Sequence, residues 1–182
     1  QTSLMRLVVS VIVFCSIIAI SQLEISDLLK LNSQYVNEYK HRKGCKHIIL
    51  SGFFSKNSLN KFLTEFYHED HKEKTKHLKI VIIQNELPSK DIQSILLNPK
   101  YEENLHYLKG DIFSEKTLSY AKVSQADAVI LQTEHNELSV NDNDDNFLIL
   151  ACKALSQITP APIYVKFHNT QSLLHDWADW DL

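Results

Sequence analysis

The segment 44–57 reads GCKHIILSGFFSKN, and it decides the fold class. Its centre, His47–Ser51, is a short and almost wholly apolar run, which is typical of a strand in a parallel sheet that is covered on both faces. Similar runs recur along the chain at Leu78–Gln84, Leu105–Lys109, Ala128–Gln132 and Pro162–Phe167. Together these runs predict a parallel sheet of five strands.

Segments with helical spacing separate the strands. Ser55–Tyr67 carries an apolar face, which indicates an amphipathic helix. Further helices are expected at Pro88–Leu97 with proline in its first turn, at Ser114–Ala121 with a serine N-cap, and at Asp144–Leu155 and Asn169–Trp177. Five repeats of strand and helix, joined by right-handed crossovers, predict an α/β fold: a doubly wound, Rossmann-like parallel sheet in the order 3-2-1-4-5.

Composition narrows the class of protein. The chain of 182 residues is long enough for one domain with a substantial core, and its net charge of −3 argues against a nucleic-acid partner. It holds 3 cysteines, which we expect to be free thiols in a reducing compartment. Because the sequence begins with Gln1, we expect it to be part of a larger protein.

The turn after the first strand argues against a dinucleotide cofactor. A dinucleotide site needs Gly-x-Gly-x-x-Gly there, but Gly52 is followed by Phe54 and Asn57 at the second and third glycine positions. The second strand ends in Gln84-Asn85, without the usual ribose-binding carboxylate. We therefore expect no NAD to bind.

The sequence shows no catalytic constellation. His68 and His71 have a spacing that could bind a metal, but they lie in a charged run that is typical of a solvated surface. His106 has no evident partner in the sequence. We therefore expect the chain not to be an enzyme.

The apolar run Leu7–Ile20 has two interpretations. It could be a signal peptide, because Arg6 precedes it and Ala19-Ile20-Ser21 resembles a cleavage site. It could instead be the inner part of a transmembrane helix, because the cluster of Lys40, Arg42 and Lys43 that follows is typical of a cytoplasmic flank.

Two segments carry a family resemblance. Gly110–Ile130 resembles the signature of RCK domains, the Rossmann-like modules that regulate the conductance of potassium, and Gly44–Gly52 is similar to the start of the first RCK domain of BK-type (Slo family) potassium channels. The resemblance extends upstream through Tyr39, Tyr35 and the acids near Glu24 to Leu7–Ile20. It implies a transmembrane helix end rather than a signal peptide.

The resemblance implies three parts: residues 1–22 as the C-terminal part of the pore-lining transmembrane helix, residues 23–43 as a linker, and residues 44–182 as the RCK domain. It implies a calcium-activated, voltage-gated potassium channel that forms a homotetramer in the membrane. Residues from about 23 onward would be cytoplasmic, and a second RCK domain would follow. The alternative function is a soluble or secreted nucleotide-dependent enzyme with a Rossmann fold.

The resemblance also implies two sites. Glu24 and Asp27 fall on acids at the inner pore mouth, where they would concentrate potassium ions. Asp142, Asp144 and Asp145 fall in a loop that the family uses to sense calcium, although the family's key acid aligns with Asn143. The alternative for these three residues is an acidic run that caps the following helix.

Overall fold

The computed structural model describes residues 6, 9, 11–22, 34–41, 44–75, 77–133 and 143–167. The chain divides into two compact units, Gln1–Val36 and Asn37–Leu182. In the first unit, residues 11–22 are helical. None of the helices among the described residues is long and apolar enough to cross a membrane.

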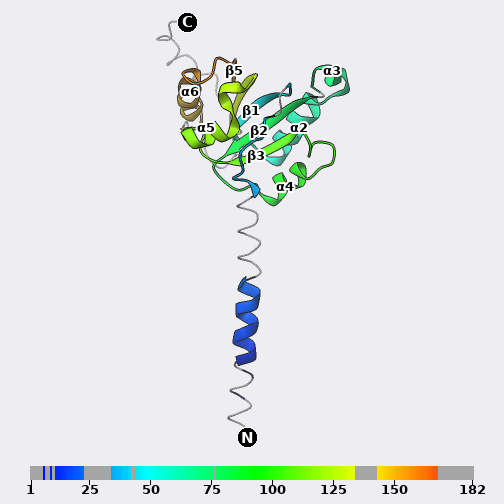
Figure 1. Ribbon diagram of the computed structural model, residues 1–182, viewed down its shortest axis with the longest axis vertical. Helices are drawn as coiled ribbons and strands as arrows, with labels where there is room; N and C mark the ends of the chain where they lie inside the picture. The colour runs from blue at the N-terminus through cyan, green and yellow to red at the C-terminus, as the bar shows by residue number, and fades with distance from the viewer. Residues whose placement is uncertain are drawn as a thin grey trace. The chain divides into compact units, whose positions relative to one another are not determined.

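The second unit is built on one five-stranded sheet (Figure 1). All neighbouring strands pair in parallel, and their order, β3-β2-β1-β4-β5, confirms the predicted one. In the central register, Ile49 lies opposite Val81 on one side and Val129 on the other. The strands are β1 (Lys46–Phe53), β2 (Leu78–Gln84), β3 (Leu105–Lys109), β4 (Ala128–Thr133) and β5 (Ile163–Lys166).

Helices connect the strands in the predicted alternation. They are α2 (Lys56–Phe66), α3 (Lys72–Thr75), α4 (Lys90–Leu96), α5 (Glu115–Ala121) and α6 (Asn143–Ser156), with 3₁₀ turns η1 (Glu69–His71) and η2 (Val123–Gln125). The predicted helix Asn169–Trp177 lies outside the described residues.

The start of α4 differs from the prediction, whereas the start of α5 confirms Ser114 as the N-cap residue. Pro88 lies before α4 and outside its first turn, because the Ser89 hydroxyl accepts the backbone N–H of Ile92 and makes Ser89 the N-cap. Ser114 occupies the N-cap position of α5, but its side chain makes no capping hydrogen bond.

The alternating strand residues form cores on both faces of the sheet. On one face, Ile49, Val81 and Val129 belong to a buried cluster that also contains Leu118 of α5 and Leu148 of α6. On the other face, residues such as Ile48 and Ile80 are buried, as are Leu59 of α2 and Ile92 of α4. In Figure 1, α5 and α6 accordingly flank the sheet on the side opposite α2. This double coverage explains why the strands are apolar throughout rather than alternating with polar residues.

Candidate functional site

A cavity of about 490 Å³ lies where β1 and β2 end. This carboxyl edge is where open parallel sheets usually bind their ligands. Its wall includes the end of β1 and the residues after it (Gly52–Ser55), the end of β2 and the residues after it (Gln84–Leu87), and Phe147 from α6. The cavity is the place in which to test the expectation that no dinucleotide binds.

Gly52 is required by the sheet itself. It is the seventh residue of β1 and pairs with Gln132 of β4. A Cβ at this position would overlap the Gln132 carbonyl oxygen, and the φ of +126° is one that other residues rarely adopt. The strand therefore explains Gly52 without a phosphate ligand.

The turn after Gly52 is occupied by aromatic side chains. Phe54 is 9% exposed and lines the cavity. Phe53 also lines the cavity, and its ring centroid lies 5.8 Å from that of Phe147. Among the described residues that line the cavity, the charged one is the acid Glu86. An aromatic wall without a cation is poorly suited to a pyrophosphate, which needs backbone N–H groups and positive charge.

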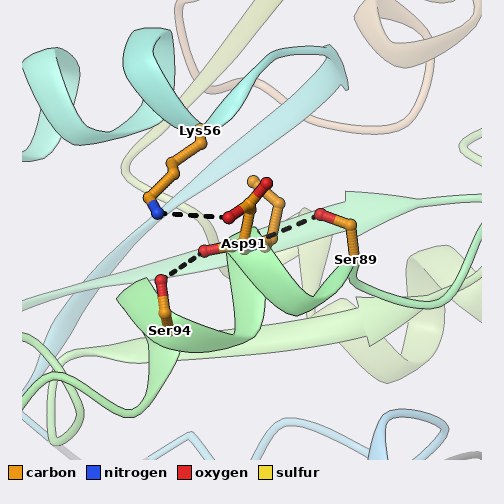
Figure 2. Close-up of polar contacts among 5 residues, drawn as sticks. Lys56, Ser89, Asp91 and Ser94 are labelled. Atoms are coloured by element: carbon orange, nitrogen blue, oxygen red, sulfur yellow. Dashed lines mark hydrogen bonds and ion pairs between the residues drawn. The ribbon is translucent and has the colours of Figure 1, made fainter.

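A lysine that follows the cavity-lining residue Ser55 is paired with a carboxylate. The Lys56 ammonium, at the start of α2, lies 3.1 Å from the Asp91 carboxylate in the first turn of α4 (Figure 2). The Ser94 hydroxyl donates to the backbone carbonyl of Asp91, 2.6 Å away, in the same view. The pair is solvent-exposed and contributes about 1 kcal/mol or less, but it connects the two helices that follow β1 and β2.

Gln84 uses its amide within the fold. Its Nε2 donates to the Gly52 carbonyl oxygen at 3.1 Å, and its Oε1 accepts the Tyr107 hydroxyl at 2.9 Å. A classical dinucleotide fold places an acidic residue near this strand end to bind the ribose. Here the amide instead joins β2 to β1 and β3, which is a structural role.

The described residues include only part of the predicted calcium site. Asp144 and Asp145 lie in the first turn of α6, which begins at Asn143, one residue earlier than predicted. Asp142 lies outside the described residues. Glu24 and Asp27, the predicted pore-mouth acids, also lie outside them.

The structure places both histidines of the charged run on the surface. His68 and His71 are exposed, and the His68 Nδ1 lies 3.2 Å from the Asp70 carboxylate. No group of three potential metal ligands is assembled among the residues that the structure describes.

A ring cluster at the opposite, amino edge of the sheet was missed by sequence reasoning. Tyr39 is 4% exposed, and its ring centroid lies 5.0 Å from that of His47 on β1 and 5.5 Å from that of His106 on β3. His41 lies beside both, 6.3 Å from Tyr39 and 5.2 Å from His47. Only the histidine in an apolar strand could have signalled it, because His106 lies far along the sequence from Tyr39, His41 and His47.

Backbone contacts attach the segment Asn37–His41 to this edge. The Tyr39 N–H donates to the Tyr120 carbonyl oxygen at 2.9 Å, and the His106 Nε2 lies 3.1 Å from the Asn37 carbonyl oxygen. Glu38 forms an ion pair with Lys122. His106 therefore has a partner, contrary to the sequence-based expectation.

Burial shapes the titration of both strand histidines. Desolvation lowers the pKa of His47, and the nearby His41 lowers it further, against smaller opposing effects of backbone hydrogen bonds and Asp127. Desolvation likewise lowers the pKa of His106, although its hydrogen bond to Asn37 opposes this. Both rings therefore favour the neutral form.

Comparison with known proteins identifies the family. The sequence model of the calcium-activated potassium channel slowpoke-like RCK domain matches residues 43–171. The chain belongs to this family. Membership confirms the resemblance drawn from the sequence, and it confirms that the chain is a regulatory domain of a channel family rather than an enzyme.

Named relatives agree with the family match. The chain is 27% identical to the calcium-activated potassium channel slo-1 of Caenorhabditis elegans over 167 residues, which cover 87% of this chain and 14% of that protein. It is 24% identical to the calcium-activated potassium channel slowpoke of Drosophila melanogaster over 165 residues, covering 87% and 13%. The chain thus spans about one seventh of the length of these relatives.

A solved structure agrees with the fold. The structure of the human SLO3 gating ring is similar to this chain, with a TM-score of 0.53 and 16% sequence identity. The match covers 70% of this chain and 20% of the gating-ring chain. The alignments to the two curated relatives each cover 87% of this chain, which is more than residues 43–182 alone make up. The likeness to the slowpoke-like proteins therefore extends upstream of the RCK domain.

Proposed function

We propose that this chain is the gating part of a calcium-activated potassium channel. In this proposal, residues 1–22 are the C-terminal part of a pore-lining transmembrane helix, residues 23–43 are a linker, and residues 44–182 are the RCK domain. The observation that carries the proposal is the family match over residues 43–171, with an alignment to two channels that continues upstream. Four such chains would surround one pore in the membrane, with residues from about 23 onward in the cytoplasm and a second RCK domain following.

The gating mechanism follows from the linker. A calcium ion shifts a closed–open equilibrium only by its different affinities for the two states. If calcium binding changes the position of the RCK domain, the linker transmits that change to the pore helix as a mechanical coupling between two sites. The attachment of Asn37–His41 to the sheet gives such a linker a fixed end.

The proposed calcium ligands are Asp142, Asp144 and Asp145. Crowded carboxylates suit a hard cation such as calcium. The same residues would also favour the start of α6, because a helix N-terminus stabilises negative charge. The two roles differ in one measurable respect: only the first depends on calcium.

Replacing all three aspartates with asparagine in the full-length channel tests the calcium role. We expect the calcium dose–response curve of the current in inside-out patches to shift at least tenfold to higher calcium, with opening in the absence of calcium nearly unchanged. The matched control is Glu102→Gln, which removes an exposed acid before β3. Overlaid curves for the triple variant and the parent would reject the calcium site and leave the helix-capping role. A protein that reaches the membrane but carries no potassium current would reject the channel itself.

A further inference from the structure

The segment Asn37–His41 packs against two histidines of the sheet, the buried His47 and the half-buried His106. The segment is fixed by its own backbone, through Tyr39 and Asn37, and by the Glu38–Lys122 ion pair. These contacts cover the amino edge of the sheet with the Tyr39 ring. His47 beneath it is 0% exposed.

His47 is held in one neutral form. Its Nε2 lies 3.2 Å from the Lys122 carbonyl oxygen, and a carbonyl can only accept, so Nε2 carries the proton. Its Nδ1 is buried and has no hydrogen-bond partner. Protonation of Nδ1 would therefore create a buried positive charge.

The charged groups around His47 do not cancel this cost. Asp127 is the nearest acid, but its carboxylate already accepts the His47 backbone N–H at 3.0 Å and lies 3.7 Å from the Lys46 ammonium. The Lys122 ammonium is paired with Glu38. His41, the remaining titratable ring beside His47, repels a second positive charge when it is protonated.

His106 adds a second group of the same kind. Its Nε2 donates to the Asn37 carbonyl oxygen, so it too carries its proton on the nitrogen that faces the segment. A positive charge on this half-buried ring would be desolvated beside the Tyr39 ring, whose centroid lies 5.5 Å away. Attachment of the segment and protonation of the rings therefore oppose each other.

We propose that the attachment of Asn37–His41 to the RCK domain is a proton-sensitive contact, held by neutral His47 and His106 and released by acid. Release would give these rings water and their ordinary titration, so the detached state binds more protons. Attachment is then strongest above the ordinary histidine pKa of about 6.5 and weakens as the pH falls below it. Each pH unit between the pKa values of the two states weakens it up to about tenfold per histidine. Its effect on a gate rests on the proposed function, but the contact itself does not.

Hydrogen exchange measured by mass spectrometry on the whole 182-residue chain tests the contact directly. The readout is the protection of amides in Asn37–His41, corrected for intrinsic exchange rates at pH 7.5 and pH 5.5. We expect protection of this segment to fall about tenfold or more at pH 5.5. The amides of β2, which pair with β1 and β3, should stay protected and so exclude global unfolding.

Two sets of variants separate titration from structure. His47→Gln with His106→Gln keeps side-chain N–H donors but removes both titrating rings, and we expect it to remove the fall in protection. His71→Gln, which changes an exposed histidine in η1, should behave as the parent does. Equal protection of the parent segment at the two pH values overturns the proposal, even if the double variant fails to fold. A fall in protection that persists in the double variant also overturns it. Neither result depends on whether the chain conducts potassium.

Discussion

Gly52 shows how one residue fixes the contact between two strands. Its φ is +126°, and the space for a side chain is filled by the backbone of Gln132 on β4. Gly44, just before β1, also has a positive φ, +86°, but nothing lies within 4 Å of the place where its Cβ would be. The two glycines therefore separate the cost of backbone strain from the cost of a collision.

Alanine substitutions at these two positions should differ in stability. We expect Gly44→Ala to lower the free energy of unfolding by about 1 kcal/mol, which is the cost of the left-handed backbone alone. We expect Gly52→Ala to lower it by roughly 3–4 kcal/mol, because β1 and β4 must also move apart. Urea unfolding of the two variants and the parent measures both values. Equal losses would show that β4 can shift to accommodate the methyl group.

At the scale of elements, the connection from β1 to α2 decides what the cavity can hold. The strand continues to Phe53, Phe54 is buried, and α2 begins at Lys56 with Ser55 as its N-cap. The Ser55 hydroxyl accepts the Ser58 N–H at 3.3 Å, which uses one of the backbone donors that a phosphate would need. At this connection, one backbone N–H fewer is therefore free to bind a phosphate.

We accordingly expect the whole chain to bind neither NAD, NADH nor ATP. The aromatic wall at Phe53 and Phe54 occupies space that a dinucleotide needs, and Glu86 repels its phosphates. Isothermal titration calorimetry with each nucleotide provides the measurement, and calcium titrated under the same conditions serves as a comparison. A dissociation constant in the micromolar range for any of the nucleotides would refute this expectation.

At the scale of the whole molecule, the proposed tetramer places acids around a pore. Four copies of Glu24 and Asp27 would bring up to eight carboxylates to the cytoplasmic mouth. Their combined potential would raise the local concentration of potassium without selecting it. Conductance would therefore depend on these residues, and selectivity would not.

Neutralising both acids, Glu24→Gln with Asp27→Asn, should reduce outward single-channel current in the full-length channel. The reduction should shrink at high internal salt, because mobile ions screen the fixed charges over about 10 Å at 0.1 M and about 3 Å at 1 M. The exchange Glu24→Asp with Asp27→Glu preserves the charge and should leave the current close to that of the parent. Unchanged conductance of the neutral variant at low salt would show that these acids do not face the pore.

The order of elements was determined by the sequence alone. Short, continuously apolar runs rich in Ile and Val, such as Leu78–Gln84, are typical of strands that are covered on both faces. The helical spacing between them makes parallel pairing with crossovers the consistent solution. The family resemblance could also be found from the sequence, because each of the segments that carry it, Gly44–Gly52 and Gly110–Ile130, is a continuous stretch. The absence of two glycines after Gly52 likewise led to the prediction that no dinucleotide binds, which the calorimetric titration tests.

Only the tertiary structure decided what the individual side chains do. Gly52 looked like the remnant of a phosphate loop, but its role depends on Gln132, which lies 80 positions away in the sequence and opposite in the sheet. His106 has no evident partner in the sequence, but the fold brings its Nε2 to 3.1 Å from the Asn37 carbonyl oxygen. Local patterns determine secondary structure because their periods act within one element, whereas burial, tautomer and pKa are set by neighbours that the fold brings together from distant parts of the chain.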